Sequence, residues 1–221
     1  MSEGMSTPII LAGEAVHLLP DPALWWPAGS TLFIADLHIG KAAVFRARGL
    51  PVPAGTTRSN LVRLSVLLAR HRPDRLVILG DFLHAAESNT PSILAALAEW
   101  RAEHAKLQLV LVRGNHDSHA GDPPASLGFE VVDEPWPLGP FACCHHPQRV
   151  PQKLVLAGHL HPAVRLRGPA RDSLRLPCFS RTAGLLLLPA FGGFTGTYLL
   201  APQAGQDLYA VGGGRVWPVP A

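Results

Sequence analysis

The 221-residue sequence has few of the features that mark secreted, membrane or disordered proteins. It contains only three cysteines, and two of them, Cys143 and Cys144, are neighbours, so a disulfide framework is excluded. The longest strongly apolar run, GLLLLPAF, is too short to span a bilayer. The N-terminal stretch MSEGMSTPII has no basic residues, and no hydrophobic core typical of a signal peptide follows it. We therefore expect a cytoplasmic protein with no membrane partner.

Charged residues are also few, and lysine is rare among the basic residues. Charged residues make up 16% of the chain and hydrophobic residues 48%, which is typical of a globular protein. Only three of the 19 basic residues are lysines, namely Lys41, Lys106 and Lys153. Arginine is the better phosphate ligand, and the net charge of +3 agrees weakly with a polyanionic partner. Arginine-rich codon usage in a GC-rich genome explains the same bias equally well.

The order of apolar segments predicts an α/β (α+β) domain. Buried strands are expected at 31–36, 75–81 and from 107, and helical spacing of apolar residues appears at 56–70 and 91–104. After residue 130 short strand-like pieces follow, with few helical periods. One domain over residues 1–221, with two packed sheets and helices outside, accommodates both halves.

Polar residues follow five of the apolar strands, at the point where each strand ends. They are Asp36 and His38; Asp81; Asn115, His116 and Asp117; His145 and His146; and His159 and His161. The carboxyl ends of strands are where open α/β folds place their ligand sites. Asp, Asn and His suit Mn, Fe or Zn, and a pair of such ions can clamp both oxygens of a phosphoryl displacement. The pattern predicts a dinuclear metal site with Asp81 as the bridging carboxylate. A single histidine on a strand is more often structural, but the convergence of several motifs disfavours that interpretation.

The ordered set DLH, GD, GNHD, H and GHLH, over residues 31–161, resembles the calcineurin-like binuclear metallophosphoesterases. The resemblance implies a four-layer αββα sandwich, with two mixed central sheets flanked by helices. It also implies two ligand sets that share Asp81. The first set is Asp36, His38, Asp81 and His161, and the second is Asp81, Asn115, His145 and His159.

The resemblance also assigns roles beyond the ligands. A metal-bridging water would be the nucleophile, and His116 would face the scissile phosphate, stabilising its charge or protonating the leaving oxygen. Asp117 would orient His116 through a hydrogen bond. In the HHP stretch we favour His145 as the ligand, because the family places it two residues before the proline, and His146 as its supporting neighbour. His84 and His119 are expected in loops or at the rim, and Cys143 and Cys144 in strand packing.

Basic residues near these motifs are candidates for substrate binding. Lys41, Arg46 and Arg48 follow DLHIG, although an exposed basic helix face explains them as well. The densest basic run lies just past GHLH and consists of Arg165, Arg167, Arg171, Arg175 and Arg181. Arg165 and Arg167 would share one strand face and could contact a nucleic-acid backbone, or form a solvated sheet face.

A closer resemblance covers nearly the whole chain. The stretches ADLHIGKAAVFRARGLPVPAGTT, LVILGDFLHA, RGNHD, LAGHLHPAVRLRGPARDSLRLPCF and LLLPAFGGFTG resemble the bacterial ligase-associated DNA-damage-response endonucleases. This implies a manganese-dependent phosphodiesterase and single-strand DNA endonuclease in DNA repair. Because Mn²⁺ is low in the affinity order of divalent metals, Fe or Zn are alternatives. The resemblance further implies functional association with a DNA ligase, a helicase and a second nuclease.

Two other functions are weighed against this one. A phosphohydrolase of a small or lipid-linked nucleotide predicts a deep, capped pocket, and the sequence has no obvious helical cap insertion between the motifs. A catalytically inactive scaffold predicts eroded ligand positions, whereas every motif position here is occupied by a suitable residue.

Overall fold

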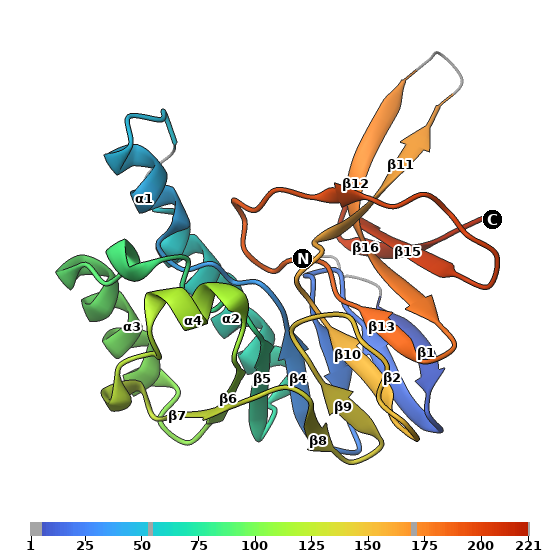
Figure 1. The fold of residues 1–221 in the computed structure, drawn as a ribbon, viewed down its shortest axis with the longest axis horizontal. Coiled ribbons are helices and arrows are strands. Elements are labelled where there is room, and N and C mark those ends of the chain that lie inside the picture. Colours follow the sequence, from blue (N-terminus) through green and yellow to red (C-terminus); the bar gives the residue numbers. More distant parts are fainter. Residues whose placement is uncertain (1–5, 53–54, 169–171, 221) are drawn as a thin grey trace.

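The computed structural model describes residues 6–52, 55–168 and 172–220, and it contains two mixed β-sheets packed face to face (Figure 1). The first sheet has seven strands in chain order: β1 (Thr7–Leu11), β2 (Glu14–Leu18), β3 (Leu24–Trp26), β4 (Thr31–Ile34), β5 (Arg75–Leu79), β6 (Gln108–Val112) and β7 (Phe129–Val132). Strands β1 to β4 pair antiparallel, and β4 to β7 pair parallel. The parallel part needs crossover helices, and these cover its outer face.

The helices are α1 (Lys41–Ala47), α2 (Thr56–His71), α3 (Pro91–Glu103) and α4 (Asn115–Ala120), with short 3₁₀ turns at Ala86–Ser88 and Ala125–Leu127. The predicted helices at 56–70 and 91–104 are confirmed as α2 and α3. Leu64 of α2 and Leu97 of α3 belong to the same buried cluster as Ile78 of β5. Thr90 caps α3, because its hydroxyl accepts from the Ile93 N–H, and Pro91 occupies the first turn.

The second sheet contains β8 (Trp136–Leu138), β9 (Phe141–Cys143), β10 (Leu154–Ala157), β11 (Pro162–Arg167), β12 (Ser173–Thr182), β13 (Leu185–Leu187), β14 (Tyr198–Leu199), β15 (Asp207–Gly212) and β16 (Arg215–Val219). The order is β14-β11-β12-β13-β10-β9-β8, with β15 paired to β12 and β16 to β15. Strands β9, β10 and β13 are parallel. The long strand β12 pairs with β11 through its first half and with β13 and β15 through its second half.

The inner faces of the two sheets form one of the two large buried clusters. Phe33 of β4 packs edge-to-face against Phe141 of β9, with ring centroids 6.3 Å apart, and Leu156 and Phe179 belong to the same cluster. All three cysteines are buried and unpaired, so the expected packing role of Cys143 and Cys144 is confirmed.

The prediction of two mixed sheets with flanking helices is confirmed. The long helices α2 and α3 pack on the first sheet, however, and no helix residue belongs to the buried cluster on the outer face of the second sheet among the described residues. Ala142 and Val155 on that face pack instead against Val150 and Leu160 from loop segments. In the described part of the chain, no helix has both the length and the apolar character needed to cross a membrane.

Candidate metal centre

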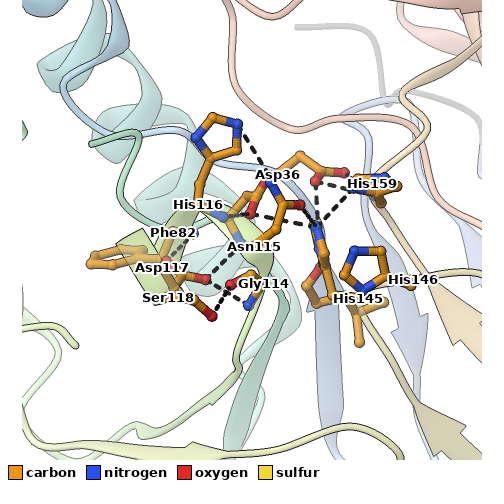
Figure 2. Close-up of polar contacts among 12 residues, drawn as sticks. Asp36, Phe82, Gly114, Asn115, His116, Asp117, Ser118, His145, His146 and His159 are labelled. Atoms are coloured by element: carbon orange, nitrogen blue, oxygen red, sulfur yellow. Dashed lines mark hydrogen bonds and ion pairs between the residues drawn. The ribbon is translucent and has the colours of Figure 1, made fainter. Parts of the chain in front are cut away.

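The predicted ligands meet where loops leave the carboxyl ends of parallel strands in both sheets. Asp81 follows β5, directly after Gly80. The segments after β4 and β6 bring Asp36 and Asn115, which begins α4, and the loops after β9 and β10 bring His145 and His159 (Figure 2). Residues more than 100 positions apart in the sequence therefore lie in direct contact. The expectation that all five motifs converge agrees with this geometry.

One group of side chains gathers around Asp36. His161 Nε2 lies 3.5 Å from Asp36 Oδ1, and His38 Nε2 lies 3.3 Å from His161 Nε2. His38 Nε2 also lies 3.6 Å from Asp81 Oδ2. The donor atoms of Asp36, His38 and His161 all lie within 4.8 Å of one another, close enough to share one ion.

A second group gathers around His145. Its Nε2 lies 2.9 Å from Asn115 Oδ1, 3.4 Å from Asp81 Oδ1 and 3.0 Å from His159 Nδ1. Asp81 thus directs one carboxylate oxygen at each group, Oδ1 at His145 and Oδ2 at His38. This is the arrangement that a bridging carboxylate requires.

The donor set fits a pair of divalent cations. Asp36 and Asp81 are buried, and among the described residues their ion-pair contacts are with histidines alone. Buried carboxylates without a permanent cation are costly unless a metal or a proton compensates them. Burial, reinforced by Lys41 and neighbouring histidines, lowers the pKa of His38 far below its ordinary value. His38 is therefore neutral at physiological pH, which is the form that binds metal.

The ligand loops adopt strained backbone conformations. Asp36, His38, Asp81, His159 and His161 have φ between 47° and 69°, and they are five of the nine non-glycine residues with positive φ among those described. The left-handed region costs on the order of 1 kcal/mol for such residues. In the HLH segment both histidines enter the site, whereas Leu160 packs on the outer face of the second sheet.

Two glycines allow the loops to approach one another. A Cβ on Gly80, whose φ is +81°, would lie 2.1 Å from His145 Nδ1. A Cβ on Gly158 would lie 2.6 Å from Asp36 Oδ2. The glycines of the GD and GH motifs are therefore required by contact between the two sheets.

The HHP segment places its two histidines differently. His145 is fully buried, and its Nδ1 lies 3.1 Å from the Leu79 carbonyl oxygen, which leaves Nε2 for the metal site. His146 is partly exposed, and its Nδ1 contacts Glu134 Oε1 at 2.6 Å. Glu134 also accepts the backbone N–H groups of both histidines. The geometry favours His145 as the ligand, and it adds Glu134, which sequence reasoning missed because no motif marks it.

The predicted hydrogen bond between Asp117 and His116 is wrong. His116 Nδ1 contacts the His84 carbonyl oxygen at 2.7 Å, so a backbone acceptor orients this ring. The Asp117 carboxylate instead accepts from the backbone N–H groups of Asp81, Phe82, Leu83 and Gly114. It therefore ties the Asp81 loop to the GNHD loop, which sequence could not reveal because its partners are main-chain groups. Burial raises the pKa of Asp117 to about 6, although these N–H groups oppose the shift.

His84 lies closer to the site than the sequence indicated. Its ring stacks on His116, with centroids 4.8 Å apart, and lies 5.3 Å from the His38 ring. His84 follows Asp81 by only three residues on the same loop, and this short spacing was the signal in the sequence that it could lie near the site. His119, in contrast, is exposed as a rim residue would be, although it lies on helix α4 and not in a loop.

The basic candidates lie on α1 and on the β11–β12 hairpin. Lys41 begins α1 and lines a small pocket with His38, and the exposed Arg46 lies on the same helix. Arg165 and Arg167 are exposed on β11, and Arg175 of β12 lies directly opposite Arg165. Arg181 forms a 4.0 Å ion pair with Asp207, and Arg171 lies outside the described residues.

Comparison with known proteins agrees with this geometry. The sequence model of the calcineurin-like phosphoesterase family matches residues 29–147. The chain is similar to the crystal structure of Pseudomonas putida nuclease MPE, with a TM-score of 0.87 and 49% identity over 97% of this chain and 100% of that one.

Two further solved structures are much less similar. A protein of unknown function, AQ665 from Aquifex aeolicus, has a TM-score of 0.41 and 20% identity, over 59% of this chain and 78% of that one. The E. coli phosphoesterase Yfce has a TM-score of 0.39 and 16% identity, over 80% of this chain and 86% of that one. No curated protein matches the chain.

Proposed function

The chain belongs to the calcineurin-like phosphoesterase family, and on that basis we propose that it is a metal-dependent endonuclease that cuts single-stranded DNA in DNA repair. The observation that carries this proposal is the position of Asp81. Its two oxygens face two separate groups of ligands, as a dinuclear phosphodiesterase requires. The 49% identity to a bacterial nuclease supports a nucleic-acid substrate.

We propose that two divalent ions bind, with manganese as the favoured metal and Fe or Zn as alternatives. The first would be held by Asp36, His38, Asp81 and His161, and the second by Asp81, Asn115, His145 and His159. Bound ions of this kind supply Lewis-acid stabilisation of phosphoryl oxygens and lower the pKa of water.

His116 is proposed to act on the leaving oxygen. The His84 carbonyl accepts a hydrogen bond from Nδ1–H, so this nitrogen carries a proton and the ring orientation is fixed. The other nitrogen, Nε2, lies 4.0 Å from Asp81 Oδ2 on a side chain that is 36% exposed. A second proton on Nε2 would make the ring a donor to the phosphate or to the departing oxygen. Asp117 serves this chemistry indirectly, by fixing the two loops that carry Asp81 and His116.

The surroundings of the centre favour a long anionic substrate. Lys41 and Arg46 lie on one side, and Arg165 and Arg167 on the β11–β12 hairpin, which projects from the second sheet (Figure 1). We propose that these four side chains contact the DNA backbone. Association with a DNA ligase, a helicase and a second nuclease remains a prediction of the family resemblance.

Cleavage of a circle tests the proposal, because a circle has no ends for an exonuclease. Metal-stripped protein is incubated with circular single-stranded DNA, with and without Mn²⁺, beside Asp81→Ala and the surface control Asp207→Ala. We expect linear products only with Mn²⁺, from the wild type and Asp207→Ala. An intact circle, together with metal-dependent hydrolysis of bis-p-nitrophenyl phosphate, would overturn the nuclease assignment and retain a phosphodiesterase of small substrates.

A further inference from the structure

Two phenylalanine rings lie beside the predicted metal centre without belonging to it. Phe194, in the loop between β13 and β14, is 37% exposed, and its ring packs edge-to-face on Phe45 of α1, with centroids 5.8 Å apart. The Phe45 ring lies 5.9 Å from the His84 ring, which in turn contacts His38. A chain of ring contacts thus joins an exposed aromatic side chain to a predicted ligand.

The loop that carries Phe194 is held firmly in place. The Gly193 N–H donates to Asn60 Oδ1 of α2 at 3.0 Å, and the Thr195 hydroxyl donates to the Gly192 carbonyl at 3.0 Å. The Gly196 carbonyl accepts from His161 Nδ1 at 2.9 Å. Phe194 therefore lies two residues from the group that orients a predicted ligand, and its exposure is not a consequence of a loosely attached loop.

A cation lies next to the same rings. Lys41 Nζ is 6.0 Å from the centroid of the Phe45 ring, one helical turn before it on α1. Lys41 and Phe194 also line the same small pocket with His38. An aromatic surface and an ammonium group at the edge of a phosphodiesterase site match the two parts of a nucleotide, its base and its phosphate.

We infer that Phe194, supported by Phe45, stacks on an unpaired base of the substrate next to the scissile phosphate. This inference rests on the proposed nuclease function and extends it to the choice of substrate. Every base has a π face, so stacking selects no sequence. A base must leave its duplex to stack on a side chain, so the contact would favour single-stranded over double-stranded substrate.

The test combines a change in the protein with a change in the DNA. Phe194→Ala and Phe194→Leu remove the ring, Phe194→Tyr keeps it, and Trp217→Ala removes an exposed ring on β16 that contacts none of the predicted ligands. Each variant is assayed with Mn²⁺ on single-stranded oligonucleotides, intact or carrying an abasic site beside the cleaved bond. Metal content is measured in parallel, so that a damaged centre is recognised.

Loss of one stacked base should raise the KM of Phe194→Ala and Phe194→Leu for the intact oligonucleotide about 5- to 150-fold, with kcat changed less. Phe194→Tyr and Trp217→Ala should match the wild type. On the abasic oligonucleotide, wild type and Phe194→Ala should have equal KM, because the stacking partner is missing. If the wild type cuts DNA but has the same KM as Phe194→Ala on the intact oligonucleotide, the stacking inference alone is overturned. A wild type that cuts no DNA would overturn the nuclease proposal and, with it, this extension.

Discussion

The two sheets supply the predicted metal centre with different chemistry. The first sheet delivers both carboxylates, Asp36 and Asp81, and the amide of Asn115, whereas the second delivers only histidines. Neutral imidazoles add no charge, so all negative charge among the predicted ligands comes from the first sheet. Two carboxylates cannot neutralise two divalent ions, and the loaded centre would keep a net positive charge toward a phosphodiester. The first sheet therefore sets the negative charge of the site, and the second adds neutral ligands to both groups.

The largest loss of metal and of activity is expected at Asp81, which contacts ligands from both sheets. Asp81→Ala removes the one carboxylate that faces both groups, so both ions should be lost. Activity on bis-p-nitrophenyl phosphate should fall by more than about 100-fold. Plasma emission of the purified variant should find almost no metal, and a variant that retains two ions per chain would contradict the bridging role.

Removal of one histidine from the second sheet should empty only one half of the centre. His145→Ala is expected to lower metal content from two ions per chain toward one, because Asp36, His38 and His161 remain together. His146→Ala is the matched control from the adjacent position, and it should retain two ions. If His146→Ala loses an ion and His145→Ala does not, the assignment within the HHP segment is reversed.

Contact between the sheets can be tested without changing a ligand. A Cβ on Gly158 would meet Asp36 Oδ2 at 2.6 Å and Ala35 Cβ at 2.7 Å, so Gly158→Ala should destabilise the metal-free fold by about 1–3 kcal/mol. Gly184→Ala is the control, since a Cβ there has no heavy atom within 4 Å. Thermal unfolding of both variants measures the difference, and equal midpoints would show that the loops can move apart at little cost.

The smallest effect is expected on the β11–β12 hairpin. Arg165 and Arg175 are opposite each other on antiparallel strands, a like-charge pair that destabilises the isolated protein. Arg165→Ala should therefore raise the free energy of unfolding by at most about 1 kcal/mol. It should also reduce the salt dependence of single-strand binding by about one unit of log–log slope. Arg181→Ala, on the neighbouring strand β12 and paired with Asp207, should change neither quantity. An unchanged slope for Arg165→Ala would remove the hairpin from the DNA-binding surface.

The same contrast between sheets decides how much of the fold was predictable. In the parallel part of the first sheet, from β4 to β6, strands and helices alternate with clear periodicity, so β4, β5, β6, α2 and α3 follow from the sequence. Among the described residues the second sheet has no helices between its strands, and the partners of these strands are set by tertiary contacts. The segment EVVDE shows the difficulty: it follows the helical half, yet Phe129–Val132 joins the first sheet as β7. The seven-residue helix α1 was missed because it is too short to show a period.

Within the site, side-chain identities were predictable and main-chain partners were not. The motifs named the side chains around Asp81, because carboxylate and imidazole chemistry is visible in the residue type. The acceptor of His116 is a backbone carbonyl, and the partners of Asp117 are four backbone N–H groups. Every residue carries such groups, so only the folded chain can identify which ones take part.

The positive φ angles at Asp36, His38, Asp81, His159 and His161 have a consequence for protein engineering. Copying these five residue types onto another α/β scaffold would not reproduce the centre, because an ordinary strand end would direct their side chains elsewhere. A successful transplant has to carry the loop conformations, the glycines that permit their contact and the Asp117 carboxylate that joins two of them. The transferable unit is a set of bent loops with their main-chain hydrogen bonds.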